Sequence, residues 1–287
     1  MSKTSSTFER FPLIRRIEHV LMLTSFSTLG LTGLPQKYPD SGISQAIVNL
    51  LGNVDNLRQV HHVAATFLML GTIYHLMMFG YKFYVERARL TMLPSLQDAK
   101  DALQAFLYNL GFAKARPQMG RYGFEEKAEY WAFVWGTVVM AITGYMMWNP
   151  IATTMYLPGE FIPAAKAAHG AEAVLAVLAI LLWHFYGVHL KTLNKAMWTG
   201  HLTEEEMLHE HPLELADIKA GIDKPVINAV TLAKRQRIYW PIAIVISAAM
   251  LYGVYNFVTS ENTAITTVPI QDVGGPIYSP QTPTPQP

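Results

Sequence analysis

Histidines within apolar segments are the residues of this chain whose types and spacing could do chemistry. Six of its ten histidines lie within or at the ends of long hydrophobic stretches: His19, His61, His75, His169, His184 and His189. Burying an ionisable side chain at membrane depth is costly, so such a residue indicates a functional site by default. Neutral imidazole is also an axial ligand of haem iron. The pattern therefore predicts b-type haem sites inside a membrane bundle.

The intervals between these histidines favour two levels of haem. His61 and His75 would lie within roughly 40° of one helical face and about 21 Å apart along the axis. His169 and His184 would lie within about 60° of one face and about 22 Å apart. Matched pairs on two antiparallel helices can clamp two haems by bis-imidazole ligation. Any one of these histidines could instead be a hydrogen-bonded packing residue, but the set of four disfavours that interpretation.

The ligands at the inner level are ambiguous in the sequence. His19 lies near the depth expected for His75 and His184, so either residue could be the partner of His184. His189 would lie about 140° around an α-helix from His184. It could ligate a third haem, contact a propionate or a quinone, or sit at the membrane interface. Depth alone allows three haems with these ligand pairs: His61–His169, His75–His184 and His19–His189.

Two cations precede the outer histidines. Arg58 stands three residues before His61, and Lys166 stands three residues before His169. Each lies at the expected membrane edge, where a haem propionate needs a positive partner. The alternative is that both are interfacial anchors whose apolar stems lie in lipid.

The composition indicates the helices that must position these residues. The chain has 287 residues, of which 51% are hydrophobic and 15% charged, against about 25% charged in soluble domains. We expect five transmembrane helices, at roughly 17–35, 60–82, 129–149, 168–190 and 238–258. The predicted fold class is an all-α membrane protein, a four-helix haem-binding transmembrane bundle plus a fifth transmembrane helix.

The distribution of positive charge predicts the orientation. Residues 1–16, 82–127 and 191–237 hold 19 of the 22 Lys and Arg residues, and five spans place these segments on one side. The positive-inside rule places that side in the cytoplasm. The N-terminus is then cytoplasmic and the C-terminus outside.

The expected organisation follows from these spans and from helix signals. The predicted parts are a cytoplasmic N-terminus at 1–16, a four-helix cytochrome b domain at 17–212, a cytoplasmic linker at 213–237, the fifth helix at 238–258 and an outer Pro-rich tail at 259–287. Ser95 and Asp98 predict a capping box for an amphipathic helix at 95–111, ended by Gly111. This helix would lie on the inner membrane surface or fold against a partner. No convincing internal repeat is visible, and the absence of cysteine excludes iron–sulfur clusters and c-type haem attachment within the chain.

Several segments resemble one known family. They are RRIEHVLMLTSFSTLGLTGL around His19, LRQVHHVAATF around His61, RYGFEEKAEYWAFVWGTVVMAITGYMMW at 121–148, and AAHGAEAVLAVLAILLWHFY running on to MWTGHL. Together they cover roughly residues 10–212. They resemble the cytochrome b (gamma) subunit of membrane-bound formate dehydrogenases and nickel–iron hydrogenases, which is a b-type di-haem membrane cytochrome.

The resemblance implies a fold, ligands and a role. The outer haem b would be ligated by His61 and His169, and the inner haem b by His19 and His184. The chain would be an electron-transfer subunit in the cytoplasmic membrane of a prokaryote, linking an outer-side redox subunit to menaquinone or ubiquinone. That partner would carry iron–sulfur clusters or be a multihaem c-type cytochrome, and nucleic acid is not an expected partner. His75, His189, the fifth span and the tail have no counterpart in the formate dehydrogenase type.

Two other classes of function stay open in the sequence. The chain could be a non-redox membrane anchor of a larger complex, or a transporter of protons or solutes that uses its histidines. Position alone suggests quinone contacts near the inner ends of the first and fourth spans, from Tyr186, His189, Lys191 and Asn194.

Overall fold

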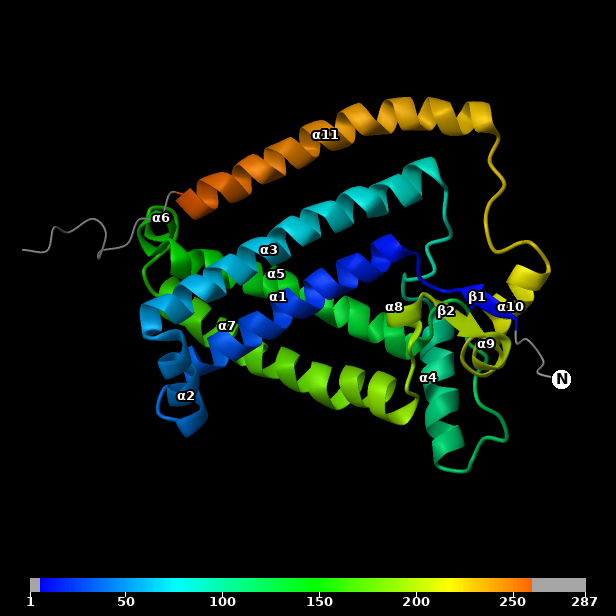
Figure 1. Cartoon of the computed structure of the whole chain (residues 1–287), viewed down its shortest axis with the longest axis horizontal. Coiled ribbons are helices and arrows are strands. Elements are labelled where there is room, and N and C mark those ends of the chain that lie inside the picture. Colours follow the sequence, from blue (N-terminus) through cyan, green and yellow to red (C-terminus); the bar gives the residue numbers. More distant parts are fainter. Residues whose placement is uncertain (1–5, 260–287) are drawn as a thin grey trace, which may run out of the picture.

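Long stretches of predominantly apolar residues form five long helices in the computed structural model, which describes residues 6–259. These helices are α1 (Leu13–Lys37), α3 (Val54–Gly80), α5 (Phe124–Trp148), α7 (Phe161–Ala179) and α11 (Ala229–Thr259). The first four form a bundle, and α11 runs along the outside of α3 (Figure 1). With the π-helical continuations of α3 and α7 included, every helix begins before its predicted span and all but α5 end beyond it. Hydropathy marks the membrane core, whereas polar residues at the ends continue the helix.

Two of the bundle helices change their winding near one end. α3 continues into the π-helix η1 (Tyr81–Val85), and α7 continues into the π-helix η2 (Ile180–Lys191). π-Helical segments are rare and are frequent at functional sites. These π-helical segments were not predicted, and η2 contains two of the six membrane histidines.

Four helices of the described residues are long and apolar enough to cross a membrane: Val54–Val85, Phe124–Trp148, Phe161–Lys191 and Ala229–Thr259. α1 lies among them in the bundle but is more polar, with several hydroxyl residues in its middle. Thr24 and Thr28 donate hydrogen bonds to backbone carbonyls four residues earlier, at 2.9 and 2.8 Å. Such bonds satisfy hydroxyl groups within the helix itself. Composition therefore supports four of the five predicted spans, and the position of α1 supports the fifth.

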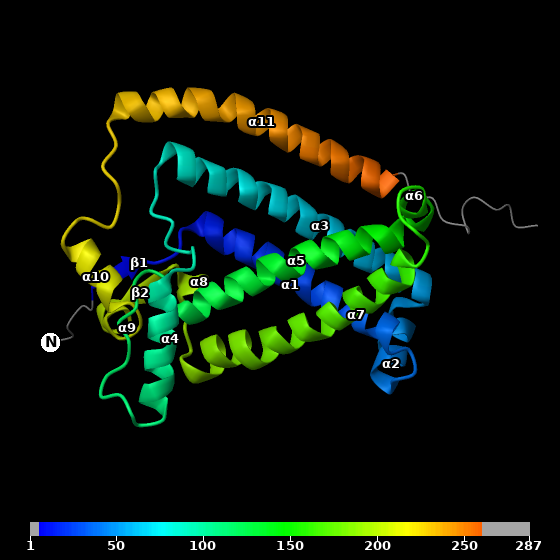
Figure 2. The same cartoon turned by 180° about the vertical axis from the view of Figure 1, so that it is seen from behind.

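The connections divide the bundle into two antiparallel pairs. α2 (Gly42–Leu51) joins α1 to α3, and α6 (Pro150–Thr154) joins α5 to α7. Both short helices lie at the same end of the bundle (Figures 1 and 2), which we call the α2/α6 end. The N-terminal segment lies at the opposite end, so α11 finishes at the end opposite to the one where the chain begins.

A small folded unit, which we call the cap, closes that opposite end. It comprises β1 (Thr7–Glu9), α8 (Ala196–Thr199), β2 (His201–Thr203), α9 (Glu204–Glu210) and α10 (Pro212–Lys219). The two strands pair antiparallel, with Phe8 opposite Leu202. Leu202, Met207 and Leu215 form its buried core with Ala196. The predicted linker at 213–237 is therefore too long, because α10 places residues 213–219 in the cap and α11 begins at Ala229.

α4 (Leu96–Asn109) lies across the bundle axis at the cap end (Figures 1 and 2). The predicted capping box of Ser95 and Asp98 is present, and Gly111 has the predicted positive φ, at 81°. Lys127 on α5 donates to Asp98 at 2.7 Å and so fastens the start of the helix to the bundle.

Candidate functional site

A large cavity runs through the interior of the bundle. Its volume is about 2460 Å³, and its walls come from α1, α3, α5, α7 and the end of α11. Sites for single small molecules typically have roughly 300–1,000 Å³, so this space can hold more than one large group. His61, His169 and His184 line it.

His61 and His169 form the pair nearer the α2/α6 end, which we call the distal pair. Their ring centroids lie 6.4 Å apart across the bundle. The neighbouring His62 turns elsewhere and stacks on Trp148 at 3.6 Å between centroids. The structure thus brings together the two residues predicted as the outer ligands.

Threonine hydroxyls fix the tautomer of both distal histidines. Thr32 Oγ1 donates to the carbonyl of Thr28 at 2.6 Å and lies 2.9 Å from His61 Nδ1. Because its own proton is used, this oxygen accepts from Nδ1–H and leaves Nε2 of His61 as the free lone pair. Thr143 repeats the arrangement, with 2.6 Å to the carbonyl of Val139 and 2.9 Å to His169 Nδ1. Ligating histidines almost always have such a partner on the other ring nitrogen.

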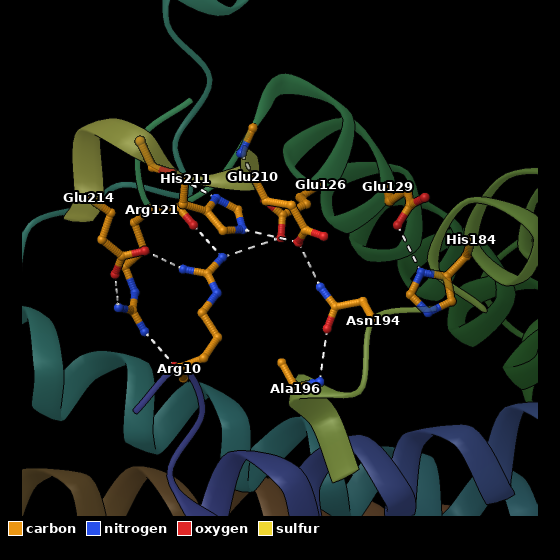
Figure 3. Close-up of polar contacts among 12 residues, drawn as sticks. Arg10, Arg121, Glu126, Glu129, His184, Asn194, Ala196, Glu210, His211 and Glu214 are labelled. Atoms are coloured by element: carbon orange, nitrogen blue, oxygen red, sulfur yellow. Dashed lines mark hydrogen bonds and ion pairs between the residues drawn. The ribbon is translucent and has the colours of Figure 1, made fainter. Parts of the chain in front are cut away.

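His19 and His184 form a second pair at the other end of the bundle, which we call the cap-side pair. Their ring centroids lie 6.3 Å apart. Nδ1 of His184 lies 2.9 Å from a carboxylate oxygen of Glu129 (Figure 3). Because a carboxylate only accepts, this contact again leaves Nε2 free to bind a metal.

The two remaining membrane histidines have other neighbours. His75 does not face His184, as the three-haem arrangement requires; its Nε2 lies 3.2 Å from the hydroxyl of Tyr130. His189 lies beside His184, at 6.2 Å between ring centroids, and not 140° around the helix. That prediction was wrong because residues 180–191 are π-helical, and the wider turn brings residues five apart onto one face.

Both pairs have the separation that bis-imidazole ligation needs. Two imidazole nitrogens at about 2 Å from one metal ion place the ring centroids roughly 6 Å apart. The distal and cap-side pairs lie at 6.4 and 6.3 Å. A Cβ on Gly33 would stand 3.1 Å from Cε1 of His61, and one on Gly144 would stand 3.4 Å from Cε1 of His169. The residues present therefore fit two haem groups.

The helix pairs α1/α3 and α5/α7 share a short motif opposite their distal histidines, which was not predicted. A Thr-Gly dipeptide stands opposite the distal histidine of each pair, Thr32-Gly33 on α1 and Thr143-Gly144 on α5. At the cap side, Tyr130 lies as far before Thr143 as His19 lies before Thr32. The repeated Thr-Gly was the available signal, but two residues are too short to identify a repeat without the contacts.

Cations line the cavity near the distal pair. Arg58 and Lys166 are both in its wall, as are Lys37 and Gln36. Lys37 approaches closely over Gly170, where a Cβ would lie 2.9 Å from Nζ. Lys37 thus joins the two cations that the sequence singled out for haem propionates.

Two carboxylates in the wall were not found from the sequence. Glu129 contacts His184, as described, and Glu172 lies one turn after His169. Glu172 lies within the predicted apolar span 168–190 and was not predicted as a site residue. Gly136 gives this side chain room, since a Cβ there would stand 2.7 Å from its Oε1.

Buried ion pairs hold the cap against the bundle (Figure 3). The guanidinium of Arg10 donates to Glu214 at 2.5 Å, and Arg121 donates to the same carboxylate. His211 Nδ1 lies 2.9 Å from the carbonyl of Gly120. Burial, with the positive charge of Arg10, lowers the pKa of His211 to about 3. The cap is therefore built around a neutral histidine.

These helices and histidine pairs define a class of protein, an all-α multi-pass membrane protein with paired histidine sites. Residues 10–200 match the family described as prokaryotic cytochrome b561. The chain belongs to the prokaryotic cytochrome b561 family, and this membership implies haem b as its cofactor.

Curated relatives agree with this family. The cytochrome b556(fdo) subunit of formate dehydrogenase from Escherichia coli K12 is 25% identical over 108 residues, 37% of this chain and 49% of that protein. The cytochrome b556(Fdn) subunit of the nitrate-inducible formate dehydrogenase from Escherichia coli K12 is 23% identical over 94 residues, 33% of this chain and 43% of that protein. The chain spans about half the length of the curated relatives it matches. The predicted resemblance to formate dehydrogenase cytochrome b subunits is confirmed at this level.

Proposed function

We propose that this chain is the membrane haem subunit of a multi-subunit oxidoreductase and carries electrons between an outer-side partner and the quinone pool. The observation that carries the proposal is the presence of two histidine pairs at 6.4 and 6.3 Å, at two levels of one bundle. When bound, haem b supplies a one-electron iron couple at each level. The protein supplies the ligands, their orientation and a dry interior.

The proposed ligands of the outer haem are His61 and His169, and those of the inner haem are His19 and His184. Arg58, Lys166 and Lys37 would neutralise propionates at the outer level. The three-haem alternative, in which His75 and His189 also ligate, has less support. That alternative pairs His75 with His184, whereas Nε2 of His75 lies 3.2 Å from the hydroxyl of Tyr130 and the ring beside His184 is that of His19.

The proposed orientation puts the cap in the cytoplasm of a prokaryote and the α2/α6 end outside. Menaquinone or ubiquinone would react near the cap-side pair, where His189 and Tyr186 are candidates by position. Asn194 is a weaker candidate, because its amide donates to Glu210 at 2.8 Å and its oxygen accepts from the amide of Ala196. Reduction of quinone there would take protons from the cytoplasm.

The proposed partner is a subunit with iron–sulfur clusters or multihaem c-type groups, since this chain has no cysteine of its own. The names of the relatives suggest a formate-oxidising complex. The rival functions, a haem-free anchor or a histidine-based transporter, need no redox group.

Haem content in the purified complex tests this proposal. A pyridine haemochrome assay should give two haems b per chain, and a reduced-minus-oxidised spectrum should show b-type α bands. His169→Ala and His184→Ala should each lose one haem, whereas His75→Phe should keep both. A wild-type complex without haem would exclude electron transfer, and loss of a haem in His75→Phe would restore the three-haem arrangement. Subunits that copurify identify the partner.

A further inference from the structure

The hydrogen-bond partners of the Nδ1 atoms, which are the ring nitrogens that would not bind iron, differ between the two histidine pairs. In the distal pair, both Nδ1 atoms meet neutral hydroxyl groups, from Thr32 and Thr143. In the cap-side pair, Nδ1 of His184 meets the carboxylate of Glu129 at 2.9 Å. Figure 3 shows Glu129 reaching from α5 to the histidine on η2. The two haem levels thus have chemically different support.

Glu129 is held for this contact. Its side chain is 25% exposed and that of His184 is 31% exposed, so both are largely removed from solvent. The cation nearest to Glu129 in the sequence is Lys127, which pairs with Asp98 at 2.7 Å and not with Glu129. Arg10, at the cap, pairs with Glu214 at 2.5 Å. Among the described residues, the ion-pair partner of Glu129 is His184.

A carboxylate acceptor changes the ligand that it supports. It draws the Nδ1 proton and increases the basicity of the ring, whereas a threonine hydroxyl, which is neutral, does so less. A more basic ligand stabilises the oxidised iron, and second-shell hydrogen bonding is one of the means by which proteins set haem potentials. The contact also fixes the orientation of a histidine that lies on a π-helical segment.

We propose that Glu129 is a positioning residue that lowers the reduction potential of the inner haem through His184. The inference rests on the proposed ligation by His19 and His184 and adds a residue that tunes it. An electron on the inner haem is then released more readily, to a quinone at the same end or to the outer haem. Thr32 and Thr143 leave the outer haem without this effect.

Redox titration of Glu129→Gln, in the full complex and followed at the α bands, tests the proposal. The amide keeps an acceptor but removes the charge. We expect two haems by haemochrome, an unchanged outer potential and an inner potential raised by about 59 mV, which corresponds to a tenfold shift in the one-electron equilibrium. The low-spin electron paramagnetic resonance signal of the inner haem should change with it.

Matched variants separate the hydrogen bond from loss of charge in general. Glu172→Gln removes a carboxylate from the same cavity that is not bonded to a histidine, and should shift the inner potential much less. Thr143→Val should disturb only the outer haem. An unshifted inner potential in Glu129→Gln, or an equal shift in Glu172→Gln, would overturn the role of Glu129.

Two further outcomes are distinguishable. If Glu129→Gln loses the inner haem, Glu129→Asp is titrated instead; its shorter side chain should weaken the bond and raise the inner potential, and an unchanged potential would refute the proposal. If His184→Ala keeps both haems, the ligation itself is wrong, whatever Glu129 does.

Discussion

At the residue scale, small side chains decide whether an imidazole can stand where a haem needs it. Gly33 lies against His61, and the space for a Cβ there is already tight at 3.1 Å. The adjacent Thr32 contacts Nδ1 of the same ring. Gly33 thus leaves room for the imidazole ring, and Thr32 fixes the rotation of that ring.

Gly33→Val should therefore displace His61 and remove most of the outer haem, while the inner haem stays. The added methyl groups cannot be accommodated without movement of the imidazole, and a shift of about 1 Å breaks a bond that requires about 2 Å. Haemochrome content should fall from two haems to about one per chain. Gly42→Val, at the start of α2 and outside the cavity wall, where no atom lies within 4 Å of a new Cβ, is the matched control and should keep both. Two haems in Gly33→Val would contradict the role given to this glycine.

The residues of the site were only partly predictable from the sequence. His61 and His169 could be found because intervals near 14 residues repeat on two helices. The competition between His19 and His75 could not be decided, since depth along a helix does not say which neighbour a side chain faces. His189 was misplaced because a π-helix cannot be read from composition. Thr32, Thr143 and Glu129 act through contacts between helices, which a single sequence does not reveal.

At the element scale, hydropathy predicted the long helices well and their surroundings less well. Four of the five predicted spans lie inside a longer helix, the span at 129–149 ends one residue beyond α5, and the capping box predicted from Ser95 and Asp98 is present. α10 was not predicted, because its eight residues are too few to show a clear helical period, and Glu214 and Leu215 are buried only through contacts in the cap.

α4 should lie with its exposed apolar face in the lipid interface. Leu96, Leu103 and Phe106 are exposed by 85%, 59% and 59%, and the helix lies across the bundle axis. Because the chain has no cysteine, single substitutions can report exposure. Leu103→Cys should resist a water-soluble maleimide in native membranes and react in detergent, whereas Lys100→Cys, on the polar flank, should react in both. Rapid labelling of Leu103→Cys in membranes would favour an aqueous or partner-bound helix.

At the scale of the whole molecule, the cap joins segments from the start, middle and end of the bundle. Its ion pairs join Arg10 and Arg121 to the shared carboxylate of Glu214, and a neutral His211 lies beside the two arginines. Protonation of this histidine would add a positive charge beside two arginines. The cohesion of the cap is therefore expected to depend on pH.

The cap should loosen as the pH falls below about 6.5. The pKa of His211 is about 3 in the folded cap and about 6.5 when the cap is unfolded. Between these two pH values, the opened cap binds a proton on His211 and the folded cap does not. The contribution of neutral His211 to the stability of the cap is fully present above pH 6.5 and is lost on acidification. The equilibrium constant for opening of the cap then rises by about tenfold per pH unit. Hydrogen exchange of cap amides between pH 6.5 and 5.5, corrected for intrinsic rates, measures this. His211→Asn should remove the slope and His209→Asn should not; a slope retained in His211→Asn would assign it to other groups.

The orientation of the whole chain follows from charge and can be tested at both ends of the bundle. The loop before α2 should face outward, because its side of the molecule has only three of the 22 Lys and Arg residues. Asp40→Cys should then react with a membrane-impermeant maleimide in intact spheroplasts. Lys224→Cys, between the cap and α11, should react only after the membrane is opened. The reverse pattern would invert the molecule, place the distal pair beside the cytoplasm, and move the proposed quinone chemistry to the outer face.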